Sequence, residues 1–129
     1  MTMSPLIPKQ CILVVDDNPE NIDLLSEVLR DDYRIRVATS GEKALKIAQS
    51  DNPPDLVLLD IMMPEMDGYQ TMQRIREEPQ HRRLPIIALT AKAMKGDREK
   101  CLEAGASDYL AKPVNTDQLM SALRMWLHR

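Results

Sequence analysis

The sequence of 129 residues contains no phenylalanine, two cysteines and four glycines, and aromatic residues make up only 3% of it. A core without Phe has to be built mainly from Ile, Leu, Val, Met and Ala, and the chain has the usual length for one domain. Cys11 and Cys101 form no CxxC motif, so we expect both to be packing residues. His81 and His128 stand in polar or terminal surroundings, and we expect both on the surface, neither as ligands nor as bases.

Other absences narrow the class of protein. Seventeen basic and 20 acidic residues give a net charge of −3, and the basic residues are scattered, which argues against nucleic acid as a partner. No apolar run is long enough to cross a membrane, and Met1–Gln10 lacks the pattern of a signal peptide. We therefore expect a cytoplasmic protein, with residues 1–9 as a disordered lead-in and residues 10–129 as one domain.

Short apolar segments are present instead, and they recur along the whole chain. Cys11–Val15, Leu56–Leu59 and Leu84–Leu89 are rich in Ile, Val and Leu, which is typical of strands buried on both faces of a parallel sheet. Tyr33–Ala38 alternates between apolar and basic residues, as a half-buried edge strand does. Ser107–Leu110 is a shorter fifth candidate. The sequence thus predicts five strands.

The segments between these strands carry helix-start signals. Asn18 can cap a helix with proline at its first position, and Ser40 precedes a second helical pattern. Asp67 and Asn115 are each followed three residues later by glutamine, the arrangement of a capping box. Residues 93–104 also form a helical pattern, but a polar one with few residues for packing. Five strands and five helices in strict alternation predict a doubly wound α/β fold.

Polar residues occur where the predicted strands end, and they are Asp16, Asp17, Asp60, Thr90 and Lys112. The carboxyl ends of parallel strands share one edge of an open sheet, so these residues should meet there. Each residue alone has an ordinary explanation as a cap, a strand end or a surface lysine, and only their convergence favours a site. Carboxylate pairs at ~4 Å repel each other by about 4 kcal/mol at an effective dielectric constant of about 20. Such a cluster should recruit a cation, and oxygen ligands favour Mg²⁺, with Mn²⁺ as a substitute.

Four segments, in matching order and spacing, resemble the receiver domain of two-component response regulators. They are Ile12–Asn18, Asp55–Gly68, Ile87–Ala91 and Ala104–Pro113, and the resemblance extends from about Gln10 to Leu127. The resemblance implies a flavodoxin-like fold with five parallel strands in the order 2-1-3-4-5 and five helices. It also implies a phosphoacceptor switch rather than an enzyme with an outside substrate. The implied phosphate donor is a histidine kinase or a histidine phosphotransfer protein.

The resemblance assigns roles to the residues around the predicted metal site. Asp60 matches the nucleophile that takes a phosphoryl group from a phosphohistidine in a Mg²⁺-dependent reaction. Asp17 matches the direct metal ligand, and Asp16 contributes partly through water. Asp60 itself and the backbone carbonyl of Met62 complete the implied metal shell. Met62 and Lys92 flank the site, and we expect them to govern water access and hence the dephosphorylation rate.

The resemblance also implies how the signal leaves the site. Thr90 and Lys112 match the groups that bind the phosphoryl oxygens, and the Lys112–Pro113 bond is expected to be cis. After phosphorylation the Thr90 hydroxyl is expected to move toward the phosphoryl group and Tyr109 to turn inward. This movement would alter the face formed by residues 93–127, which is the expected docking surface for a downstream partner. We expect a monomer or a weak dimer.

Two other functions lack the residues that they require in this sequence. Phosphatases with a strand-end aspartate nucleophile usually carry a second aspartate two positions later, and here that residue is Met62, which transfers no proton. The sequence contains neither the GxGxxG nor the GxxxxGK[ST] motif of nucleotide-binding proteins, which argues against nucleotide binding. Within the receiver class, a stand-alone regulator and the receiver of a hybrid histidine kinase both stay open. The segments Ala88–Met94 and Pro113–Asn115 favour the hybrid kinase.

Overall fold

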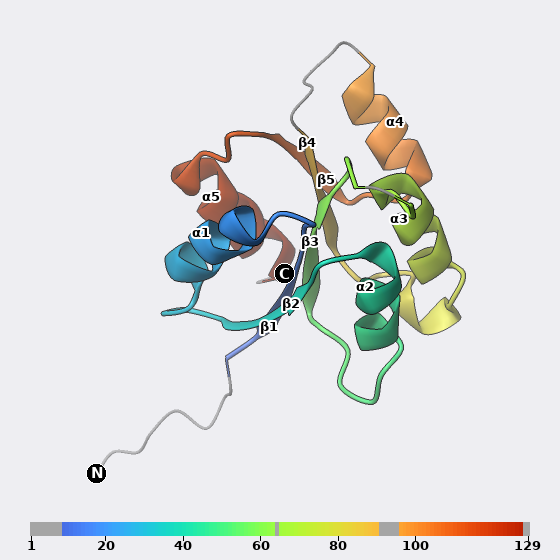
Figure 1. Cartoon of the computed structure of the whole chain (residues 1–129), viewed down its shortest axis with the longest axis horizontal. Coiled ribbons are helices and arrows are strands. Elements are labelled where there is room, and N and C mark those ends of the chain that lie inside the picture. Colours follow the sequence, from blue (N-terminus) through green and yellow to red (C-terminus); the bar gives the residue numbers. More distant parts are fainter. Residues whose placement is uncertain (1–8, 64, 91–95, 128–129) are drawn as a thin grey trace.

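The computed structural model describes residues 9–63, 65–90 and 96–127, and it shows a parallel sheet between two layers of helices (Figure 1). The strands are β1 (Cys11–Val15), β2 (Arg34–Ala38), β3 (Leu56–Asp60), β4 (Ile86–Thr90) and β5 (Asp108–Ala111). The helices are α1 (Pro19–Leu29), α2 (Gly41–Ala48), α3 (Gly68–Arg76), α4 (Asp97–Ala104) and α5 (Thr116–Leu127), with a short 3-10 helix at Pro79–His81. The strand order β2-β1-β3-β4-β5 confirms the predicted fold, including β2 as an edge strand. No helix in the described ranges is long and apolar enough to span a bilayer.

The three central strands are buried on both faces because their apolar residues alternate between two cores. In β1, Leu13 and Val15 belong to the core under α2, α3 and α4, whereas Ile12 and Val14 belong to the core under α1 and α5. The residues of β3 and β4 divide in the same way. A continuous apolar run is therefore what this sandwich requires, and the three runs in the sequence supply it.

The predicted helix caps are present. Asn18 Oδ1 accepts a hydrogen bond from the Glu20 amide at 2.9 Å, and Ser40 Oγ accepts one from the Lys43 amide at 3.2 Å. Asp67 and its glutamine three residues on bond reciprocally, which completes the predicted capping box of α3. Asn115 Oδ1 accepts a hydrogen bond from the amide three residues on at 3.0 Å. These bonds satisfy amides that have no partner inside the helix.

The predicted bounds of β2, β3 and β5 differ from the observed ones by one residue, and two other predicted starts are wrong by two residues or more. β4 begins at Ile86 and not at Leu84, because Pro85 has no amide hydrogen to donate to a neighbouring strand. The helix expected over residues 93–104 begins at Asp97, because Gly96 has a positive φ of 93° and interrupts the helical conformation. Residues 93–95, the predicted lead-in up to residue 8, Lys92 and His128 lie outside the described residues.

The prediction for His81 is also wrong. Its side chain is only 4% exposed, and Nε2 has no hydrogen-bond partner among the described residues. The short 3-10 helix turns the chain back, so that Arg76 and Leu84 both donate to the His81 carbonyl oxygen and the imidazole lies inside. Polar neighbours in the sequence therefore gave a false indication of exposure. Cys11 and Cys101 are both buried free thiols, as predicted.

Candidate functional site

Asp60 lies at the end of β3 with 3% of its surface exposed. The Met62 amide donates to its Oδ1 atom at 3.1 Å, and Lys112 Nζ lies 3.4 Å from the same oxygen. Burial raises the pKa of the Asp60 carboxyl above its usual range, and nearby Asp16 adds to the rise, whereas the Met62 amide and Lys112 oppose it. The folded chain therefore holds this carboxylate in surroundings that disfavour its charge.

Asp16 and Asp17 follow β1 directly. Asp16 is buried, and its Oδ1 atom accepts from the Asn18 amide at 2.9 Å, while Asp17 is exposed. Oxygen atoms of Asp16, Asp17 and Asp60 all lie within 4.8 Å of one another. Three carboxylates at this range form a set of hard oxygen donors, so the residues present fit a Mg²⁺ ion.

Lys112 follows β5 and joins the carboxylates of two strands. Its Nζ atom lies 3.1 Å from Asp16 Oδ2 and 3.4 Å from Asp60 Oδ1, and the Lys112 side chain is 21% exposed. The backbone amide of Lys112 donates to the Thr90 carbonyl at 2.7 Å, which fixes it beside the end of β4. Thr90 itself is buried, and the Lys112–Pro113 peptide bond is cis. The five predicted strand-end residues therefore do meet at one edge of the sheet.

Two residues that shape this edge were missed by the sequence analysis. The Asn21 side-chain amide donates to Asp16 Oδ2 at 3.2 Å and helps to hold that carboxylate. At Gly68, a Cβ atom would lie 2.6 Å from the Ile61 Cα atom and 2.7 Å from the Asp60 carbonyl oxygen. Only glycine lets α3 begin this close to the end of β3. The Met62 side chain is 52% exposed beside the site.

Tyr109 lies in β5 and is half-buried against the core under α2, α3 and α4. Burial raises its pKa, and Asp97 and Cys101 of α4 act in the same direction. The thiol of Cys101 donates to the Tyr69 hydroxyl over 4.0 Å, and Lys100 Nζ lies 4.7 Å from the centre of the Tyr69 ring. Burial raises the pKa of Tyr69 to about 12. These contacts join α4 to the start of α3, which is close to the site.

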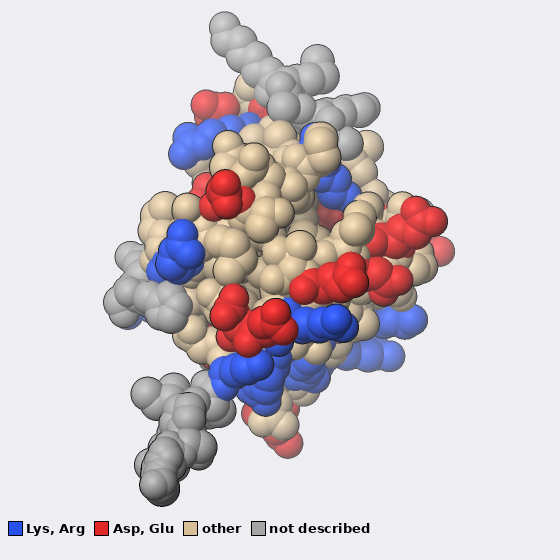
Figure 2. Space-filling model, turned by 90° about the vertical axis from the view of Figure 1, so that its left-hand side faces the viewer, with Lys and Arg blue, Asp and Glu red and all other residues tan. Residues whose placement is uncertain are grey.

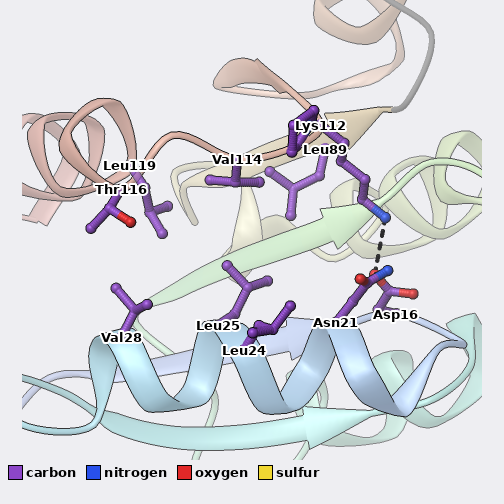
Figure 3. Close-up of a pocket in the computed structure, with 11 residues that line it drawn as sticks. Asp16, Asn21, Leu24, Leu25, Val28, Leu89, Lys112, Val114, Thr116 and Leu119 are labelled. Atoms are coloured by element: carbon purple, nitrogen blue, oxygen red, sulfur yellow. Dashed lines mark hydrogen bonds and ion pairs between the residues drawn. The ribbon is translucent and has the colours of Figure 1, made fainter.

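An apolar groove of about 520 Å³ opens beside the Lys112–Asp16 ion pair, between α1 and the segment that leads into α5 (Figure 3). Leu24, Leu25 and Val28 of α1 face Val114 and Leu119 across it. Leu24 is 62% exposed and Val28 is 39% exposed, so part of the apolar lining of the groove faces solvent. Asp16 and Lys112 thus belong both to the lining of the groove and to the carboxylate site.

Comparison with known proteins agrees with this geometry. The pattern of the response regulator receiver domain matches residues 12–124. The chain is 44% identical over 128 residues to a Vibrio cholerae protein named "Probable cyclic di-GMP phosphodiesterase", covering 98% of this chain but only 28% of that protein. The chain therefore spans less than a third of that relative.

Two solved structures are similar over nearly their full length. The receiver domain of the sensor histidine kinase PA1611 from Pseudomonas aeruginosa PAO1, with a magnesium ion in its active site cleft, has a TM-score of 0.86 and 42% identity. That match covers 94% of this chain and 99% of the other. The co-crystal structure of the Saccharomyces cerevisiae phosphotransfer protein Ypd1 with the receiver domain of Ssk1 has a TM-score of 0.85 and 28% identity. That match covers 96% of this chain and 92% of the other. The chain therefore belongs to the response regulator receiver domain family.

Proposed function

We propose that the chain is a phosphoacceptor switch in which Asp60 takes a phosphoryl group from a phosphohistidine. The observation that carries this proposal is the position of the Asp60 carboxylate, buried at a strand end, within 4.8 Å of two other carboxylates and 3.4 Å from Lys112 Nζ. A nucleophile with a cation beside it and a set of metal donors around it suits phosphoryl transfer, which depends on positioning and charge stabilisation.

The metal site supports the same reaction. Asp16, Asp17 and Asp60, with the backbone carbonyl of Met62, would hold Mg²⁺. When bound, the ion supplies positive charge that offsets the charge of the phosphoryl group in transfer. The magnesium ion in the related PA1611 receiver domain supports this choice of metal.

Residues of the chain itself carry out the transfer, bind the product and limit its hydrolysis. An Asp60 carboxylate oxygen forms a bond to phosphorus, the N–P bond of the phosphohistidine breaks, and its electron pair returns to the imidazole. Lys112 Nζ and the Thr90 hydroxyl then bind the oxygens of the acyl phosphate. Asp16 stays in place because its oxygens already accept bonds from Asn18 and Asn21. The exposed Met62 side chain limits the approach of water to the product.

The phosphorylated site then changes a surface. The modification adds roughly −1.5 to −2 charges at Asp60, by analogy with other phosphorylated residues. Thr90 moves toward the new group, Tyr109 turns inward, and the face of residues 93–127 changes for a downstream partner. The similarity to a histidine kinase receiver supports the hybrid-kinase alternative. A cytoplasmic location and a monomeric or weakly dimeric state are part of the same proposal.

The apolar groove supports a donor that docks next to Asp60. A phosphohistidine must reach the site from a protein surface, and the apolar groove along α1 adjoins the site. The side of the molecule that carries α1 and α5 shows a largely uncharged area between charged groups (Figure 2). Glu20, Asp23 and Glu27 are exposed on α1. A donor helix with an apolar stripe and basic flanks fits this surface, and the Ypd1–Ssk1 complex supports a phosphotransfer protein as the partner.

Labelling with acetyl phosphate tests the proposal. The wild type should gain one phosphoryl group in Mg²⁺ and none in EDTA, as measured by intact-protein mass spectrometry. Asp60→Asn should gain none, and Asp51→Asn, at an exposed aspartate outside the site, should label as the wild type does. Equal labelling of Asp60→Asn and the wild type would refute the proposal. Repeated turnover of a phosphomonoester would favour a phosphatase instead.

A further inference from the structure

Asp16 is the most deeply buried of the three site carboxylates, with 1% of its surface exposed, and both of its oxygens accept hydrogen bonds. Oδ1 accepts from the Asn18 amide at 2.9 Å. Oδ2 accepts from the side-chain amide of Asn21 at 3.2 Å and from Lys112 Nζ at 3.1 Å. A buried carboxylate needs such partners, because an unpaired charged oxygen inside a protein is costly. Two donors therefore share one oxygen of Asp16.

The two donors to Oδ2 differ in how they are held. Asn21 lies in the first turn of α1, and its backbone amide donates to the Asn18 carbonyl oxygen at 3.1 Å. Its short side chain lies beside Asp16, whereas the long side chain of Lys112 reaches Asp16 from across the groove (Figure 3). Lys112 Nζ is also 3.4 Å from Asp60 Oδ1, so it already divides its contacts between two carboxylates. Asn21 is thus the fixed donor, and Lys112 is the one that can exchange partners.

The two donors also differ in their response to charge. An ionised carboxylate only accepts hydrogen bonds, so the NH₂ group of Asn21 must face Asp16. That amide is neutral, whereas the ammonium of Lys112 is a compact point charge on a flexible stem. A phosphoryl group on Asp60 adds roughly −1.5 to −2 charges close to Lys112. The added charge attracts the ammonium away from Asp16 and leaves the bond from Asn21 in place.

We propose that Asn21 is a positioning residue that keeps Asp16 oriented when Lys112 turns to the phosphoryl group. Before transfer, both donors bind Oδ2 of Asp16, and after transfer Asn21 binds it without Lys112. The carboxylate then keeps its place among the metal donors, so the acyl phosphate form retains Mg²⁺. The exchange of partners by Lys112 rests on the proposed function, whereas the bond from Asn21 to Asp16 does not.

Mn²⁺ binding with and without beryllofluoride, a phosphoryl mimic, tests the role of Asn21. The electron paramagnetic resonance signal of free Mn²⁺ gives the affinity. Without the mimic, Asn21→Ala should bind Mn²⁺ about threefold more weakly than the wild type, because Lys112 still binds Asp16. With the mimic the loss should grow to about tenfold, as is common when a group that orients a metal ligand is removed. Asn52→Ala, the same change at an exposed asparagine between α2 and β3, should match the wild type in both conditions.

Two further measurements separate positioning from a general loss of structure. In acetyl phosphate labelling of Asn21→Ala, the Mg²⁺ concentration that gives half the maximal rate should rise, and the rate at saturating Mg²⁺ should fall far less. In a double-mutant cycle, Asn21→Ala should weaken Mn²⁺ binding more in the Lys112→Met background than in the wild type, because both donors to Oδ2 are then gone. If the double variant does not fold, the comparison with and without the mimic still decides.

Two results would overturn the role of Asn21. They are a wild-type Mn²⁺ affinity in Asn21→Ala, and a loss of affinity that is equal with and without the mimic. Labelling of the wild type by acetyl phosphate shows how far the error extends. If the wild type is labelled, only the role of Asn21 is wrong. If it is not labelled and binds no Mn²⁺, the proposed function is wrong as well.

Discussion

Lys112 and Arg76 are two partly buried cations at opposite ends of the same sheet, and they differ in the groups that bind them. Lys112 lies between the carboxylates of Asp16 and Asp60, at the carboxyl ends of the strands. Arg76 donates to the carbonyl oxygens of Gly105 and His81, near the opposite ends of the strands. The first cation has partners that can bind protons, metal or phosphoryl groups. The second has backbone carbonyl partners, which do not titrate and accept no phosphoryl group.

This difference separates a responsive end of the molecule from a fixed one. At the carboxyl edge, burial raises the pKa of Asp60, so the folded state carries a charge that its surroundings disfavour. Removing that charge should stabilise the fold. In the proposed function, metal binding offsets the charge, and phosphoryl transfer then increases it. At the other edge, the guanidinium of Arg76 donates to carbonyl oxygens, which neither gain nor lose protons. Variants at the two edges should therefore respond differently to Mg²⁺ and to pH.

Lys112→Met should have the largest effect on stability. It leaves two buried carboxylates without their cation, and removing one partner of a buried pair costs about 3 kcal/mol of unfolding free energy. Because Lys112 lowers the pKa of Asp60, its loss raises that pKa further, so the deficit should shrink as the pH falls through the raised pKa. Mg²⁺ should also reduce it. Urea unfolding in EDTA and in Mg²⁺ measures both effects, and a deficit that is indifferent to metal and pH would contradict the comparison.

Arg76→Gln should have the second largest effect. It removes charge-assisted hydrogen bonds to several carbonyl oxygens, and we expect a loss of about 2 kcal/mol. The loss should be the same in EDTA and in Mg²⁺ and should not vary with pH, because arginine stays protonated and its partners do not titrate. The same urea titrations serve as the measurement. A loss that Mg²⁺ reverses would mean that the two ends of the sheet are not independent.

Asp60→Asn should stabilise the fold by about 1 kcal/mol near neutral pH without metal, the usual size of a gain at a functional site. The folded pKa of Asp60 lies above its unfolded value, so the ionised carboxylate opposes folding above the folded pKa. As the pH falls through that pKa, the wild type becomes neutral at Asp60 and the advantage of asparagine should fade. Thermal unfolding across the acidic range measures this gain, and a gain that grew toward acid would have the wrong sign.

Arg74→Gln should have the smallest effect on the free energy of unfolding and serves as the control for Arg76→Gln. Arg74 lies two residues from Arg76, but its partner Glu77 is 3.8 Å away and the two side chains are 55% and 70% exposed. Exposed pairs of this kind contribute less than about 0.5 kcal/mol. A loss as large as that of Arg76→Gln would show that cations in this helix act through general charge and not through the carbonyl contacts.

The carboxyl edge could be predicted from the sequence because it follows from topology. Once three apolar runs are recognised as parallel strands, Asp16, Asp60 and Thr90 must lie at one edge, whatever the detail of the packing. The helix caps at Asn18, Ser40 and Asp67 were equally predictable, since each depends on residues within one turn.

The opposite edge could not be predicted, because its bonds run to backbone atoms far along the chain. Arg76 binds the carbonyl of Gly105, and a carbonyl group is present at every residue, so the sequence contains no complementary signal. His81 was assigned to the surface for a related reason, because the turn that buries it depends on where its carbonyl oxygen finds donors. Asn21 and Gly68 act on atoms of other segments, and neither contact follows from local pattern.

The reaction rates of the two buried cysteines can report which part of the protein opens. Cys101 is fully buried in α4, and Cys11 is 4% exposed in β1, and burial raises the pKa of both thiols. A thiol-reactive reagent can therefore modify Cys101 only while α4 is away from α3, and Cys11 only while the sheet itself is open. The ratio of the two modification rates separates helix opening from global unfolding in the unaltered chain, with no added label.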